Sequence, residues 1–181
     1  MYKRQIPQGE PFQFYPRRSI ITAVSTAGDN LAADNSSFDL TLNGFSLGST
    51  ARNVSASLIN ANFVNTFIPS GNLPNPLILE ANFIDGDGIN PQGQASQILA
   101  MIPHKNDYYV TFDQSFQLAV PCTLADLQSP DGGTTPPTAT FTLKDGAGNL
   151  VNGGPEWAVQ VRLSWEEQES YAEARDNRHF Y

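Results

Sequence analysis

The strongest constraint on the fold is a period of two in the hydrophobic residues near the C-terminus. Apolar side chains at every second position are Trp157, Val159, Val161, Leu163 and Trp165, and the positions between them carry small, polar or charged residues. Successive side chains of a β-strand point to opposite faces. We therefore expect a long strand over 157–166, with both tryptophans on the face that packs against a second sheet.

Shorter apolar segments recur along the chain between clusters of turn residues. The segment 37–43 alternates Phe38, Leu40 and Leu42 with polar residues, and the turn 145–149 follows an apolar run. This spacing is typical of an all-β sandwich or barrel. Eight strands are predicted, at 19–25, 37–43, 53–63, 77–84, 97–102, 108–120, 138–144 and 157–166. The segment 108–120 is either one strand or two strands with a bend between them.

The length of 181 residues fits one domain, and 14 glycines with 13 prolines suit many strands joined by turns. We expect a β-sandwich domain over 19–166. The proline-rich segment 121–137 is expected to be a surface loop. In the tail, 167–181, acidic residues precede Arg175 and Arg178, which favours a short helix because these charges suit its two ends.

The first 18 residues are expected to form an extended arm. Three prolines disfavour a helix, and aromatic and basic residues lie between and beside them. Because exposed aromatic rings are unfavourable in water, the arm is expected to pack along its own domain or a neighbouring subunit. A solvated tail is the alternative. The arm residues with this expected contact role are Lys3, Arg4, Phe12, Phe14, Tyr15, Arg17 and Arg18.

The net charge of −8 argues against nucleic acid as a partner of the domain itself. Acidic surfaces repel phosphate, so only the basic arm is suited to touch nucleic acid, and no sequence-specific reading is expected. The apolar runs are far shorter than the roughly 20 residues of a membrane-spanning helix. The N-terminal segment has no apolar stretch typical of a secretory signal, so synthesis in a cytoplasm is expected.

The residues that carry most enzyme chemistry are scarce. The histidines are His104 and His179, and Cys122 is the one cysteine, with neither histidine near it in the sequence. A nucleophilic enzyme needs a serine or cysteine beside an oriented histidine, so thiol and serine catalysis are not expected. The segment 85–90 has the spaced aspartates of a calcium loop, but Ile89 stands where such a loop needs an oxygen ligand. A glycine-rich turn is the favoured interpretation, and no cofactor or metal is expected.

Tyr109 is the aromatic residue that the alternation pattern places away from the core. It lies on the face opposite to Tyr108 and Val110, so we expect it at a surface or an interface.

Two parts of the chain resemble a known family. The hairpin formed by 140–146 and 156–161, together with the segment 58–76, resembles the single jelly-roll capsid proteins of icosahedral viruses and phages. The resemblance implies a jelly-roll sandwich of about eight antiparallel strands with an N-terminal arm. It further implies a penton or minor capsid subunit of the virion, commonly pentameric, that contacts itself and other capsid proteins through residues 3–18.

Two other functions stay open at this point. A receptor- or carbohydrate-binding module of a virion spike or fibre would use loops at one end of the sandwich, or Tyr109. A glycoside hydrolase needs only two carboxylates at a suitable separation, and the chain has 18 acidic residues. Because these acids form no recognisable motif, we expect a protein that is not an enzyme.

Overall fold

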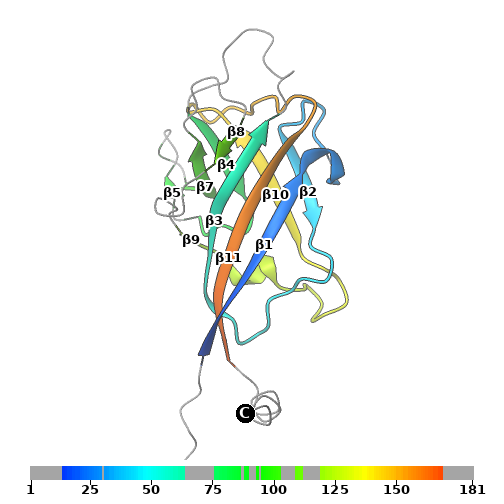
Figure 1. Cartoon of the computed structure of the whole chain (residues 1–181), viewed down its shortest axis with the longest axis vertical. Coiled ribbons are helices and arrows are strands. Elements are labelled where there is room, and N and C mark those ends of the chain that lie inside the picture. The colour runs from blue at the N-terminus through cyan, green and yellow to red at the C-terminus, as the bar shows by residue number, and fades with distance from the viewer. Residues whose placement is uncertain are drawn as a thin grey trace, which may run out of the picture.

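The computed structural model is an all-β sandwich with two antiparallel sheets and very little helix (Figure 1). It describes residues 14–29, 31–63, 76–86, 88–89, 93, 95–102, 109–111 and 119–168, with the backbone alone at 88–89, 95 and 109–111. This confirms the predicted fold class at the level of a β-sandwich.

The first sheet is built around two long central strands. Its order is β1-β11-β3-β8, and β9 also pairs with β3. These strands are β1 (Phe14–Val24), β3 (Arg52–Phe63), β8 (Tyr109–Thr111), β9 (Val120–Pro121) and β11 (Trp157–Gln168). Strands β1 and β11 pair without a register shift from Phe14 opposite Gln168 to Val24 opposite Ala158.

The second sheet has the order β2-β10-β4-β7. Its strands are β2 (Ser37–Thr41), β4 (Leu77–Ala81), β7 (Ile98–Ile102) and β10 (Thr138–Lys144). A separate hairpin joins β5 (Gly88–Ile89) to β6 (Ala95–Ser96), and the short 3-10 helices are η1 (Ser25–Ala27) and η4 (Leu124–Leu127).

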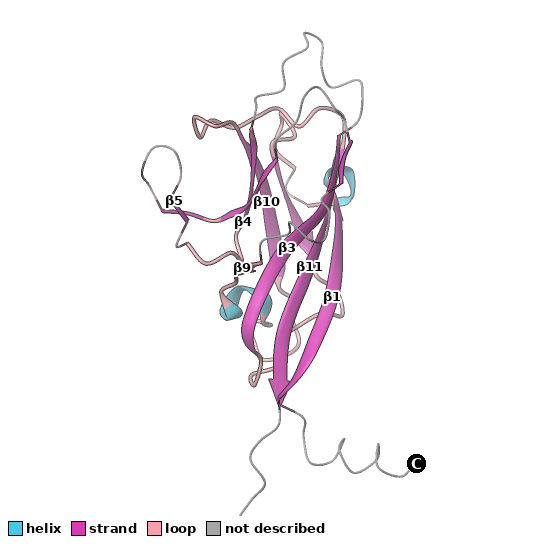
Figure 2. Cartoon of the chain, turned by 60° about the vertical axis from the view of Figure 1, so that its left-hand side comes forward, coloured by secondary structure: helices cyan, strands magenta, loops and turns pink. Residues whose placement is uncertain are grey.

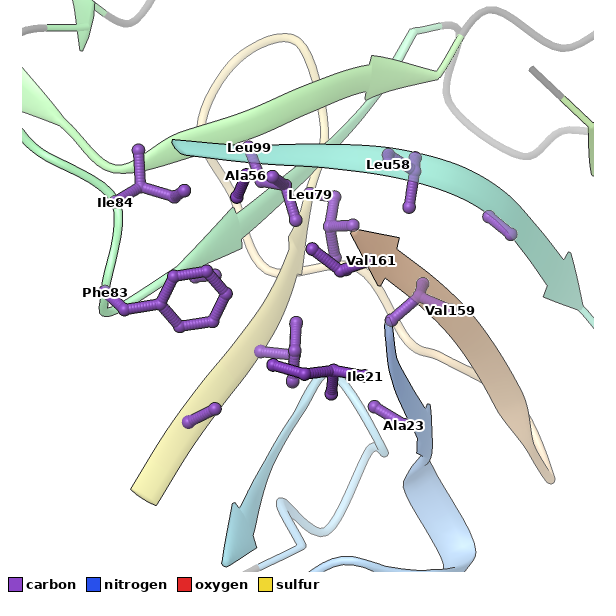
Figure 3. Packing of buried hydrophobic residues seen from close by; sticks show 14 of the residues in the cluster. Ile21, Ala23, Ala56, Leu58, Leu79, Phe83, Ile84, Leu99, Val159 and Val161 are labelled. Atoms are coloured by element: carbon purple, nitrogen blue, oxygen red, sulfur yellow. The ribbon is translucent and has the colours of Figure 1, made fainter. Parts of the chain in front are cut away.

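The hydrophobic core lies between the two sheets. Figure 3 shows Ile21, Val159 and Val161 of the first sheet in the same cluster as Leu79 and Phe83 from the other side. An aromatic chain crosses this core at one end of the molecule. The ring centroids of Phe38 and Trp157 are 4.9 Å apart, and those of Phe38 and Phe141 are 5.7 Å apart. The contact between Phe38 and Trp157 is edge-to-face, a geometry that adds to the stability gained from burial.

Trp157 is fixed by hydrogen bonds at the start of β11. Its indole Nε1 donates to the carbonyl oxygen of Asn35 at 2.8 Å, and its backbone N–H donates to Ser25 Oγ at 3.1 Å. Asn35 has a φ of +54° and donates its side-chain amide to the carbonyl oxygen of Gly154 at 2.7 Å. The tryptophan is fully buried, and these bonds satisfy its polar groups.

The period of two near the C-terminus is confirmed as a strand with one buried face. Trp157, Val159, Val161 and Leu163 are fully buried, while Trp165 is half-buried and packs edge-to-face on Phe45. The predicted strand 138–144 coincides with β10, and 37–43 and 53–63 correspond to β2 and β3 within two residues at each end. β11 continues to Gln168, which places Glu167 and Gln168 in a strand rather than in the predicted helical tail.

The first strand differs from its prediction because it begins at Phe14 rather than at residue 19. Phe14, Tyr15, Arg17 and Arg18 therefore belong to β1, inside the segment that we expected to be an arm. The longer β11 supplies partners for these residues, and Pro16 is tolerated because β1 is an edge strand. Lys3, Arg4 and Phe12 lie outside the described residues.

Other differences concern the middle of the chain. The predicted strand 77–84 ends at Ala81, because the chain turns so that Phe83 and Ile84 enter the core from a loop. The segment 108–120 contributes two short strands, β8 and β9, on the same edge of β3. The expected surface loop 121–137 includes η4, whose Leu127 is fully buried.

Candidate interaction surface

The outer face of the first sheet is largely polar. It carries the residues of β1, β11 and β3 that alternate with the core-facing ones. These residues are Pro16, Arg18, Ile20, Thr22 and Val24 of β1, Ala158, Gln160, Arg162, Ser164 and Glu166 of β11, and Ser55, Asn60 and Asn62 of β3. Their side chains are mostly amides, hydroxyls and guanidinium groups, so this face is suited to hydrogen bonding.

A row of polar side chains runs across this face. The register places Thr22, Gln160, Asn60 and Thr111 side by side on four neighbouring strands. Asn60 Nδ2 donates to Gln160 Oε1 at 2.7 Å, and Gln160 Nε2 donates to Thr22 Oγ1 at 3.4 Å. Cross-strand pairs of this kind hold the side chains in fixed positions.

Tyr109 lies two residues before Thr111 on β8, so it belongs to the next row of residues on the same face of the sheet. It pairs with Asn62, which in turn pairs with Ala158. The adjacent row, Val110 with Ala61, is the one that faces the core, since Ala61 is fully buried. The register thus places Tyr109 on the outer face of the sheet.

The end of the sheet where β1 begins and β11 ends carries a cluster of charged and aromatic groups. Figure 2 shows β1, β3 and β11 converging toward this end. The guanidinium carbon of Arg52 lies 3.2 Å from the centroid of the Phe14 ring, and Arg52 Nε donates to Glu166 Oε2 at 2.9 Å. Asn53 Nδ2 donates to the same oxygen at 3.0 Å.

The predicted arm residues that the structure describes lie together at this end. Phe14 is held under Arg52, and Arg17 approaches Glu167 at 3.9 Å. Tyr15 and Arg18 are exposed. The cluster therefore links the start of β1 to both β3 and β11 through side chains as well as through backbone pairing.

The charged residues that the structure describes are unevenly distributed between the two sheets. Four of the arginines lie on strands of the first sheet: Arg17, Arg18, Arg52 and Arg162. Lys144 lies on the second sheet and pairs with Glu80 at 2.6 Å. Outside the first sheet the described acidic residues are Asp29, Asp34, Asp39, Glu80, Asp85, Asp126, Asp131, Asp145 and Glu156. The first sheet also carries Glu166 and Glu167 on β11, so its described residues have a small excess of positive charge, while the described loops and second sheet are acidic.

The loop between β9 and β10 contains a turn organised by Asp131. Its carboxylate accepts bonds from the backbone N–H groups of Thr134 and Thr135, at 3.0 and 2.8 Å, and from the hydroxyls of Ser129 and both threonines. These bonds stabilise the charged form and hold the pKa of Asp131 well below its usual range, with the Thr134 hydroxyl contributing most. The turn is a self-contained surface structure.

Cys122 has the environment of a structural thiol. Burial raises its pKa to about 12, and the nearby charge of Asp85 acts in the same direction. Such a thiol is protonated at neutral pH and a poor nucleophile. Of the predicted calcium-like segment, Asp85 is described, and its backbone N–H donates to the carbonyl oxygen of Pro121 at 3.0 Å; Asp87 and Asn90 lie outside the described residues.

The requirements of a metal site and of a membrane-spanning helix can also be compared with the described residues. Within the described ranges, no three histidine, cysteine, aspartate or glutamate side chains gather in a way that suits a metal ion. The described part of the chain also contains no helix with the length and apolar character needed to cross a bilayer.

Neither a protein-family model nor a curated protein sequence matches this chain.

Sequence reasoning missed the two asparagines that shape the sheet. Asn53, with φ of +52°, lies where the pairing of β3 with β11 shifts register, and the bulge there brings Arg52 over Phe14. Asparagine is one of the few non-glycine residues that adopt this conformation readily, so an asparagine within a predicted strand was the available signal. Asn35 offered no comparable signal, because its partner Trp157 is distant in the sequence.

Proposed function

We propose that this chain is a single jelly roll that serves as a non-enzymatic structural subunit of a virus or phage particle. The observation that carries the proposal is the nested order of strand pairing. The first long strand pairs with the last, and each later pair lies inside the previous one: β1 with β11, β2 with β10, β3 with β8 and β9, and β4 with β7. Jelly rolls of this kind are typical of viral capsid domains and of lectins.

The shell role agrees with the distribution of side chains. The described residues of the first sheet include four arginines and two glutamates, whereas the described loops and second sheet are acidic, and this difference in charge suits contact between neighbouring copies in a ring. The segment before β1 and the segment after β11 leave the sheet at the same end, where Phe14 pairs with Gln168. We propose a penton or minor capsid subunit, made in the host cytoplasm and located in the virion, with residues 1–13 reaching adjacent shell proteins.

The test is the mass of the full chain in solution. Size-exclusion chromatography with light scattering, followed by negative-stain electron microscopy, is expected to give a closed ring with a mass that is a fixed multiple, above two, of 19.7 kDa. A pentamer is the expected multiple. A strictly monomeric chain at high concentration, with its N-terminal segment intact, would contradict the proposal.

A carbohydrate- or receptor-binding module is the second candidate, because the row of amides and hydroxyls lies beside the register position of Tyr109. Sugar hydroxyls bind to fixed amide groups and stack on aromatic rings. Binding on a glycan array that is lost in Tyr109→Ala, with the circular dichroism spectrum unchanged, would favour this function. The absence of binding across the array would remove it.

A further inference from the structure

The free edge of β1 differs from the β2 edge of the second sheet and from the β8–β9 edge of the first sheet. The edge of β2 is covered by its own loop, since Asp29 and Asp39 exchange backbone hydrogen bonds at 2.7 and 2.8 Å. The opposite edge of the first sheet consists of the short strands β8 and β9. β1 presents a continuous edge over Phe14–Val24, paired on its other side with β11.

The two halves of this edge have different protection against pairing. Proteins commonly block exposed edges with proline and with charged residues. Pro16, Arg17 and Arg18 block the first half of β1, but the second half, 19–24, reads Ser-Ile-Ile-Thr-Ala-Val. This half carries no charge and no proline, and Ile20 is 59% exposed. Such a segment is suited to pair with another strand.

The backbone groups that face this edge follow from the start of β11. The backbone N–H of Trp157 points toward β1, because it donates to Ser25 Oγ. Backbone direction alternates along a strand, so the N–H groups of Val159 and Val161 also point to β1, opposite Ala23 and Ile21. Even-numbered residues of β1 therefore turn their N–H and C=O groups to the free edge. Pro16 has the same parity, where its missing N–H costs no bond to β11.

We propose that residues 20–24 of β1 pair antiparallel with the same residues of a second copy of this chain. Two identical edges that pair antiparallel are related by a two-fold axis. Edge-facing residues must then lie opposite edge-facing residues. The pairing that the structure favours places Thr22 opposite Thr22, and Ile20 opposite Val24, which covers the exposed isoleucine.

The positions of charged residues and of Pro16 favour this register over the one that places Ile20 opposite Ile20. With Thr22 opposite itself, the paired strands end where Ile20 faces Val24, and Arg18 of each copy lies just beyond Val24 of the other, beside the 3-10 helix η1 that contains Thr26. The hydroxyl of Thr26 donates to Glu156 Oε2 at 2.6 Å, so each arginine approaches the other copy's carboxylate. A shift that places Ile20 opposite Ile20 brings Arg18 opposite Thr22 and draws Pro16, which has no N–H to donate, into the pairing. The contact is independent of the proposed shell role.

Disulfide formation tests the register directly. Residues that face each other in a hydrogen-bonded antiparallel pair have Cα atoms about 5.5 Å apart, within the range of a disulfide. Thr22→Cys is therefore expected to form a covalent dimer under mild oxidation. Ile20→Cys is the matched control on the same face, since the two copies of residue 20 would lie about 13 Å apart along the strand. A dimer from Ile20→Cys alone would overturn the register, and no dimer from either variant would overturn the contact.

A second measurement separates this contact from other ways of covering the edge. Amide hydrogen exchange of the full chain is expected to protect Ile20 and Thr22 at high concentration and to release them on dilution. Thr22→Pro is expected to abolish this protection while leaving the melting temperature within a few degrees, because it removes an N–H that faces away from β11. Thr22→Val is the control, since it keeps the N–H and should keep the protection.

Protection that is independent of concentration would mean that the same chain covers the edge, and would overturn the pairing of copies. A ring that forms without disulfide formation at Thr22→Cys would overturn this contact alone.

Discussion

Single residues with unusual backbone requirements hold together the end of the sandwich where β11 begins. Asn35 adopts a left-handed conformation and binds Gly154, and its carbonyl oxygen accepts the indole N–H of Trp157. The burial of Trp157 followed from the alternation of its segment. Its partner did not, because a pairing across this distance in the chain depends on how the loops meet.

Gly153 is expected to be the glycine most sensitive to substitution in this region. A Cβ atom there would overlap the carbonyl oxygen of Asn35 and lie 2.5 Å from Trp157 Nε1. Because both neighbours are fixed by hydrogen bonds, Gly153→Ala should reduce the free energy of unfolding by about 2 kcal/mol or more, measured by urea denaturation. Gly146→Ala is the control, since its Cβ would contact only Pro76 Cδ at an ordinary 3.7 Å. Equal stability of the two variants would contradict this account.

The turn around Asp131 is expected to resist acid. Its pKa is lowered in the folded chain, so the contribution of the charged form is complete above the ordinary value of 3.8 and is lost only as the pH falls through the lower folded value. The NMR shifts of the Thr134 and Thr135 amides should therefore stay constant down to about pH 4. Asp131→Ala should show the shifts of an open turn at every pH. A midpoint near the ordinary value in the wild-type chain would count against these bonds.

At the scale of elements, strands with a clear period of two were predicted well, and short or interrupted ones were not. β10 and β11 each place alternate apolar residues in the core, and their sequences carry that pattern without a break. The start of β1 was missed, because residues 14–18 contain proline and charge and have no inward apolar residues. Their strand conformation depends on pairing with the end of β11, which local sequence does not reveal.

Arg52 is expected to hold the start of β1 in place. Arg52→Ala removes the contact with Phe14 and the bond to Glu166, both at the surface, so the global loss of stability should be about 1 kcal/mol or less. The local effect should be larger: the amides of Tyr15 and Arg17, which face β11, should exchange faster by hydrogen-exchange mass spectrometry. Arg52→Lys keeps the charge and should have a smaller effect. Unchanged exchange in Arg52→Ala would show that backbone pairing alone fixes this segment.

At the scale of the whole molecule, the fold class was predictable and the interaction surface was only partly so. The repeated apolar segments predicted a sandwich, whereas the surface or interface position expected for Tyr109 stays a prediction, with its backbone paired to Asn62. The gathering of four described arginines on the first sheet was not predictable, because it depends on which strands become neighbours.

Cryo-electron microscopy of particles captured with an antibody against the exposed loop 129–135 would test the central claim most directly. The account predicts density for this sandwich at symmetry-related positions of an icosahedral shell, with copies side by side around an axis. Particles that lack the chain, or that carry it only at the tip of a fibre, would contradict it.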